Sequence, residues 1–231
     1  MAFAWVQDDL GTNDASGTVL SQAFTSNVVS GNLLIAVSRF EDADTVATLT
    51  STRVTGNWTQ VAGGNHAAGI SVYLHYAIAE SSGACTVTQT LTAASIFRRL
   101  FIHEYSGGLG TSAVFGKATQ KFNVGANATC GPLERLTANE LGFAAVGEDS
   151  GVTFAAAGGF TERQEQDCQT QDLIASATGD LLAQWTNAAT ANSVAVFALF
   201  RSEALASVAA PAGSVIGMGG HSILRTNYKR F

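Results

Sequence analysis

Apolar and polar residues alternate along most of this chain, and that two-residue period restricts its possible folds. The clearest case is Ile70-Ser-Val-Tyr-Leu-His-Tyr-Ala-Ile78, whose side chains would point to opposite faces of a strand in turn. Residues 18–24, 46–52 and 85–91 repeat the pattern on a Thr-rich background, and Thr favours strands through its branched β-carbon. The pattern predicts an all-β protein.

Short apolar runs bounded by turn residues predict the other strands. Residues 91–100 and 179–190 are compatible with either helix or strand, and we assign both to strands. About a dozen short strands with turn signals every 8–12 residues or so are typical of a sandwich or barrel, and we expect one antiparallel β-sandwich over residues 1–201. The remaining strands are expected at 33–40, 58–61, 100–105, 113–120, 139–146, 173–178 and 193–201, with another running from 159 toward 168.

Residues 202–231 differ from the rest and predict an extended C-terminal arm. An Ala/Ser-rich linker leads into a Gly-rich apolar stretch and then a basic, aromatic end, with no acidic residue after Glu203. An apolar arm of this kind is a poor solvent-exposed tail, so we expect it to lie on another subunit. The expected docking residues are Ile216, Met218, Arg225, Tyr228, Lys229, Arg230 and Phe231.

The charge content limits the partners. Charged residues make up only 13% of the 231 residues, and the net charge is −6. An acidic body lacks the clustered Lys and Arg that phosphate contacts require, so we expect no nucleic-acid partner. The chain has neither a basic and apolar signal sequence nor an apolar run of about 18 residues. We therefore expect synthesis in a host cytoplasm without membrane insertion.

The three cysteines, Cys85, Cys130 and Cys168, are widely spaced and form no CxxC or Cys/His pattern. This spacing disfavours a zinc site. One disulfide with a leftover thiol is an alternative, but we favour three reduced thiols.

The order of several short motifs resembles jelly-roll-like β-sandwich domains of phage particle proteins and of bacterial surface or polysaccharide-associated proteins. The resemblance covers residues 1 to about 201, and Glu104-Tyr-Ser-Gly107 is its most distinctive piece. The resemblance implies a jelly-roll fold, but its motifs carry no known catalytic residues. Any function inferred from it therefore rests on similarity of fold alone. The motifs lie at residues 73–78, 85–88, 103–107, 140–143, 159–161 and 194–200.

No catalytic pattern is found in the sequence. His103 and Glu104 are adjacent on a predicted strand, so their side chains should face opposite ways and cannot work as an acid–base pair. Glu41, Asp42 and Asp44 place three carboxylates in one loop, where calcium is one interpretation and a solvated loop the favoured one. We expect no other cofactor and no enzymatic activity, although carboxylates paired by the fold would escape this reasoning.

Aromatic residues are the candidates for sugar binding, because sugar C–H faces pack on aromatic rings. The residues considered are Trp58, Trp185, Tyr73 and Tyr76, with core packing as the favoured alternative for both tryptophans. The leading functional expectation is a non-enzymatic bacteriophage virion protein: a capsid decoration, head-fibre or tail-fibre-associated subunit that forms homo-oligomers, binds other virion subunits and contacts the host. The alternative is a carbohydrate-binding module that recognises cell-surface glycan.

Overall fold

The computed structural model describes residues 2–41, 45–67, 69–107 and 114–201. Within them every regular element is a β-strand, every strand pair is antiparallel, and no helix is long and apolar enough to cross a membrane. The strands are β1 (Ala4–Asn13), β2 (Gly17–Ala23), β3 (Leu33–Glu41), β4 (Val46–Ser51), β5 (Thr59–His66), β6 (Ile70–Ile78), β7 (Thr86–Ser95), β8 (Arg98–Ser106), β9 (Val114–Arg135), β10 (Leu141–Glu148), β11 (Phe154–Ala157), β12 (Thr161–Glu165), β13 (Cys168–Ile174) and β14 (Gly179–Arg201).

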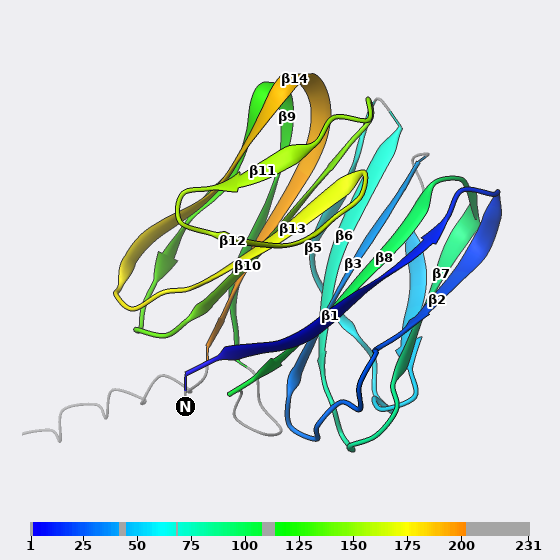
Figure 1. Cartoon of the computed structure of the whole chain (residues 1–231), viewed down its shortest axis with the longest axis vertical. Helices are drawn as coiled ribbons and strands as arrows, with labels where there is room; N and C mark the ends of the chain where they lie inside the picture. Colours follow the sequence, from blue (N-terminus) through cyan, green and yellow to red (C-terminus); the bar gives the residue numbers. More distant parts are fainter. Residues whose placement is uncertain (1, 42–44, 68, 108–113, 202–231) are drawn as a thin grey trace, which may run out of the picture.

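The strands form three stacked sheets (Figure 1). The central sheet has the order β1-β8-β3-β6-β5. The small outer sheet, β2-β7-β4, covers one of its faces. The large outer sheet, β11-β14-β10-β13-β12 with β9 paired to β14, covers the other. The all-β antiparallel sandwich predicted from the two-residue period is therefore confirmed.

Side-chain alternation in the central sheet supplies two cores at once. On β3, Leu33, Ile35 and Val37 pack toward the large outer sheet, whereas Leu34 and Ala36 pack toward the small one. Burial on both faces explains why β3 is apolar almost throughout. The core shared with the large outer sheet joins the N-terminal and C-terminal halves of the chain into one body.

The jelly roll itself is not confirmed. A jelly roll wraps eight strands as two Greek keys, which puts strands 1, 8, 3 and 6 in one sheet and strands 2, 7, 4 and 5 in the other. The first half of this chain has β1-β8-β3-β6 facing β2-β7-β4, but β5 pairs with β6 in the central sheet. Strands β9 to β14 then add a third sheet outside that scheme.

The large outer sheet curls around a core of its own. The register between β9 and β14 shifts at Thr186/Ala191, opposite Gly125, which has a positive φ of 139°. Such a bulge bends a strand. Both halves of β14 consequently face the same apolar cluster, where Trp185 and Phe197 are buried together.

Several predicted elements need correction. The strand predicted at 58–61 is longer, since β5 continues through Gly63 and Gly64 to His66. Glycine is needed at position 63 because a side chain there would collide with the Tyr73 ring. The strand predicted from 159 toward 168 is β12, which ends at Glu165. The one predicted at 173–178 is the end of β13, which begins at Cys168 and stops at Ile174. Strands β1, β11 and the second half of β9 were not predicted. Residues 91–100 and 179–190 contribute to strands, as assigned.

Cys85, Cys130 and Cys168 are free thiols, as favoured from their spacing. Each is buried in a different apolar cluster, so none has another within reach. Burial raises the pKa of the Cys130 thiol to about 12. The thiols serve as small apolar side chains.

Candidate functional site

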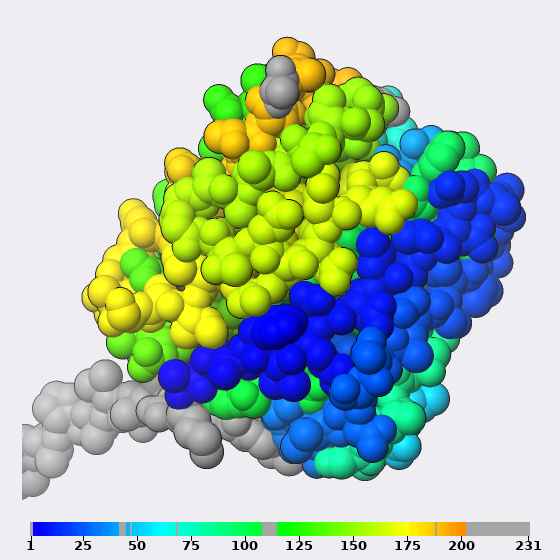
Figure 2. Space-filling view, viewed as in Figure 1, coloured from blue at the N-terminus to red at the C-terminus, as the bar shows by residue number. Residues whose placement is uncertain are grey.

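Polar side chains gather where the central sheet meets the large outer sheet, along β1 and β8 on one side and β12 and β13 on the other. We call this region the sheet junction, formed by Trp5, Asp8, His103, Tyr105, Arg163, Gln164 and Asp172. Figure 2 shows β1, in dark blue, lying against the yellow-green strands of the large outer sheet. Strand pairing places Asp8 opposite His103.

Asp172 is the centre of the sheet junction. Its carboxylate is 2% exposed, accepts a hydrogen bond of 2.5 Å from the Tyr105 hydroxyl, and is bound in bidentate fashion by Arg163 at 2.8 and 3.0 Å. Charge-assisted bidentate pairs of this kind are strong and directional. Burial, reinforced by the Asp172 charge, raises the pKa of Tyr105 well above 10. The phenol therefore remains a donor and connects β8 to β12 and β13.

His103 is fully buried beside this group. Its ring meets Phe143 edge-on at a centroid distance of 4.9 Å, and its Nδ1 lies 3.7 Å from Asp8 Oδ2, longer than a hydrogen bond. Burial lowers the pKa of His103, against the raising influence of Asp8, so the ring is neutral at pH 7. Asp8 is also held by Gln164 Nε2 at 2.8 Å. A general base must reach its substrate, and this imidazole is enclosed.

Glu104 contacts different elements from His103, as expected for neighbours on a strand. Its carboxylate is completely buried and accepts hydrogen bonds from Asn32 Nδ2 at 2.6 Å, Gln7 Nε2 at 2.6 Å and the backbone N–H of Val29 at 2.9 Å. These donors connect β1 and the loop before β3 to β8. The carboxylate acts as a structural acceptor.

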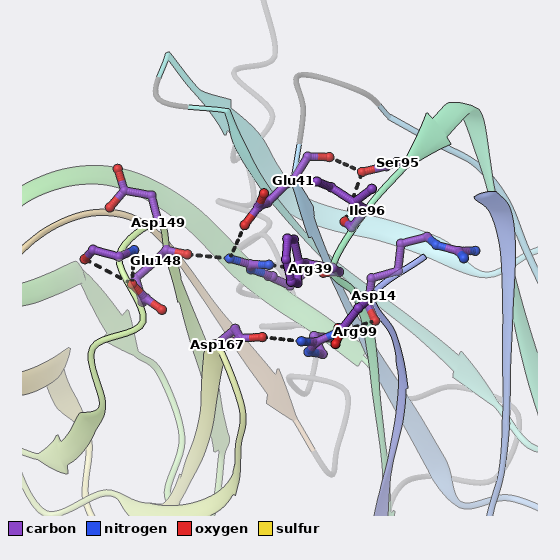
Figure 3. A network of polar contacts seen from close by, with 12 residues as sticks. Asp14, Arg39, Glu41, Ser95, Ile96, Arg99, Glu148, Asp149 and Asp167 are labelled. Atoms are coloured by element: carbon purple, nitrogen blue, oxygen red, sulfur yellow. Dashed lines mark hydrogen bonds and ion pairs between the residues drawn. The ribbon is translucent and has the colours of Figure 1, made fainter. Parts of the chain in front are cut away.

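A second group of charges, the arginine pair, is centred on Arg39 and Arg99 (Figure 3). Arg39 Nη2 donates to the backbone oxygen of Glu148 at 2.6 Å and lies 3.7 Å from Glu41. Arg99 donates to Asp14 at 2.7 Å and to Asp167. Both arginines start on the central sheet and reach β10 and the β12–β13 turn. They border a cavity of about 260 Å³.

The two groups have the same chemical character. Each cation is matched by a carboxylate or carbonyl from another sheet or loop. Buried charges require such pairing to be tolerated at all. The arrangement is suited to fixing the register of two sheets.

Three of the four residues considered for sugar stacking are inside the protein, and Tyr76 is partly buried. Trp58, Trp185 and Tyr73 are 7%, 1% and 6% exposed and belong to three different apolar clusters, so they form no platform. Trp5 is the exposed tryptophan, at 41%, with the Arg163 guanidinium 4.8 Å from its ring centroid. Sequence reasoning missed it because β1 was not predicted as a strand.

The other predicted site residues are only partly described. Glu41 is paired with Arg39, whereas Asp42, Asp44 and the arm residues 216–231 lie outside the described residues. Within the described ranges, no three His, Cys, Asp or Glu side chains are grouped so as to hold a metal.

The comparisons with known proteins return no match: no family model, no curated protein and no solved structure matches this chain.

Proposed function

We propose that this protein is a non-enzymatic structural subunit of a bacteriophage-like particle. Residues 1–201 serve as a rigid block, and residues 202–231 dock on a neighbouring subunit. The protein is made in the host cytoplasm and incorporated into virions as a homo-oligomeric decoration, head-fibre or tail-associated component. Its partners are other virion subunits and the host surface.

The observation that carries the proposal is the outer face of the small outer sheet. Leu20, Leu49 and Val87 point inward to the core, so the residues between them point outward. Cross-strand hydroxyl contacts such as Ser21 Oγ to Thr88 Oγ1, 2.8 Å, order this surface. We call it the hydroxyl face: Val19, Ser21, Ala23, Thr48, Thr50, Thr86, Thr88 and Thr90.

None of the residues of the hydroxyl face is charged. A flat surface of short side chains loses little conformational entropy and no ionic hydration when another protein covers it. This face therefore suits repeated contacts in an assembly better than an isolated molecule in solution. The buried charges also support a structural role, because their pairing holds the sheets of the body together.

Mass spectrometry of purified particles tests the proposal, which requires the chain to be a stoichiometric component; its absence from particles would refute it. A Thr50→Lys variant should be excluded from particles, since it places an ammonium group on the hydroxyl face. Thr161→Lys, an exposed position at the edge strand β12, is the matched control and should be incorporated normally.

A further inference from the structure

A cavity of about 540 Å³, which we call the end cavity, opens beside the end of β6. It is bounded by the loop before β3, the loop between β4 and β5, and the last residues of β6. Its volume lies within the roughly 300–1,000 Å³ usual for small-molecule sites. Its lining consists of Ser30, Gly31, Val54, Gly56, Asn57, Thr59, Tyr76, Ala77, Ile78, Ala79 and Glu80.

The cavity follows from the strand pairing. Strand β5 begins at Thr59, which lies opposite Tyr76. The last residues of β6, up to Ile78, therefore pair with β3 on one edge but with no residue of β5 on the other. Residues of the chain before Thr59 line the space beside this edge. Gly31 and Gly56 line the space and have no side chains to fill it. Gly31 also has a positive φ of 89°, which disfavours replacement.

Glu80 gives the end cavity a fixed acceptor. Its carboxylate takes hydrogen bonds from the Thr55 hydroxyl, the Thr55 backbone N–H at 3.0 Å and the Gly56 backbone N–H at 3.2 Å. These bonds, the Thr55 hydroxyl first, lower the pKa of Glu80 and keep it ionised. A carboxylate has about four acceptor positions, so capacity remains for a ligand.

Tyr76 lines the cavity, and its ring is held by two other aromatic rings. Its ring stacks on Phe115 at 6.0 Å and meets Phe200 edge-on at 5.4 Å. Held by both rings, Tyr76 needs no ordering when a ligand arrives. The exposed side chains of Asn57 and Thr59 add an amide and a hydroxyl at the rim.

We propose that the end cavity binds a neutral sugar residue of a glycan. A fixed carboxylate accepts hydrogen bonds from sugar hydroxyls, the Asn57 amide both donates and accepts, and Tyr76 with Ile78 packs against the apolar C–H face. An anionic ligand is disfavoured because Glu80 is the one charged residue in the lining and no basic residue offsets it. This site does not depend on the virion assignment.

A nitrogen-15 NMR titration with glucose, galactose, N-acetylglucosamine and rhamnose tests it. Saturable shifts are expected at residues 30–31, 54–59 and 76–80 for at least one sugar. Asn57→Ala should weaken binding about fivefold, and Glu80→Gln about tenfold, the usual values of a neutral and a charged hydrogen bond. Glu134→Gln, an exposed carboxylate on β9, should leave the affinity unchanged.

A melting curve for each variant shows that it is folded. If Glu80→Gln melts early, Asn57→Trp provides the second test, because it changes an exposed side chain and fills the mouth of the cavity. The proposal is overturned if no sugar produces saturable shifts, if the shifts persist in Asn57→Trp, or if methylammonium alone produces them. Particle incorporation measured separately distinguishes this failure from failure of the structural role.

Discussion

Arg39 and Arg99 lie directly opposite each other on the paired strands β3 and β8, and both are at least 97% buried. Two like charges at paired positions repel. They are tolerated because each has acceptors around it. Arg39 donates to the backbone oxygen of Glu148 and lies 3.7 Å from the Glu41 carboxylate. Arg99 donates to the carboxylates of Asp14 and Asp167. The large outer sheet and its β12–β13 turn therefore supply part of the pairing that these two arginines of the central sheet need.

The first prediction concerns this pair. Arg99→Met should lower the free energy of unfolding by about 2–4 kcal/mol, because it leaves Asp167 without its cation. Urea denaturation measures the change. Lys117→Met breaks an exposed pair with Glu134 and should cost at most about 0.5 kcal/mol. Equal losses in the two variants would contradict the structural role of the arginine pair.

The second prediction concerns Asp172. Arg163→Met leaves this buried carboxylate without its bidentate cation and should cost about 3–5 kcal/mol, whereas Tyr105→Phe removes one hydrogen bond and should cost about 1–2 kcal/mol. A double-mutant cycle by chemical denaturation gives the coupling between the two. Additive losses would mean that Tyr105 and Arg163 do not share this carboxylate.

The third prediction is that acid weakens the fold before the carboxylates titrate. Burial lowers the pKa of His103, and lowers that of His75 from 6.5 to about 4. The unfolded chain therefore binds protons that the folded one does not, so stability is full above pH 6.5 and falls toward pH 4. His75 alone accounts for about 3 kcal/mol at 1.4 kcal/mol per pKa unit.

Thermal melts between pH 7.5 and 4.5 measure this loss. His103 faces Asp8, Asp172 and Arg163, whose charges oppose one another around the ring. The variant carrying both His75→Gln and His103→Gln should show a shallower decline than the unsubstituted protein. If stability fell with pH as steeply in this variant as in the unsubstituted protein, groups other than the two histidines would cause the acid sensitivity.

The fourth prediction concerns Gly147 on β10. A methyl group there would come within 2.6 Å of Val72 Cγ2 and 3.1 Å of Arg39 Cγ, where the large outer sheet contacts the central sheet. Gly147→Ala should therefore cost about 1–3 kcal/mol through overpacking. At Gly56 the nearest atom would be 3.6 Å away, so Gly56→Ala serves as the tolerated control in the same melts.

The fifth prediction concerns the arm. Arg201 pairs with Val114, and its guanidinium donates to Glu140 at 2.7 Å. The last residue of β14 is therefore held within the sandwich by its own contacts. Deletion of residues 205–231 should leave the melting temperature unchanged and abolish assembly, as measured by light scattering and particle incorporation. Normal assembly of the truncated chain would refute the docking role.

The sequence by itself determined the local conformation. Alternation in residues 70–78 predicts β6 with the bounds observed. Residues 91–100 and 179–190 were compatible with helix or strand, and the assignment to strands is confirmed. Isolated cysteines predicted free thiols. These inferences succeed because side-chain direction along a strand depends only on the strand itself.

Only the tertiary structure decided which strands meet. The sequence of a strand that is buried on both faces does not show which strand lies beside it. The pairing of β5 with β6 could therefore not be predicted from the residue pattern, and neither could the curl that buries Trp185. The contact of Arg99 with Asp167 was equally hidden, because long-range pairing is selected by the packing of whole sheets and not by local spacing. Likewise, the end cavity exists because of where β5 begins.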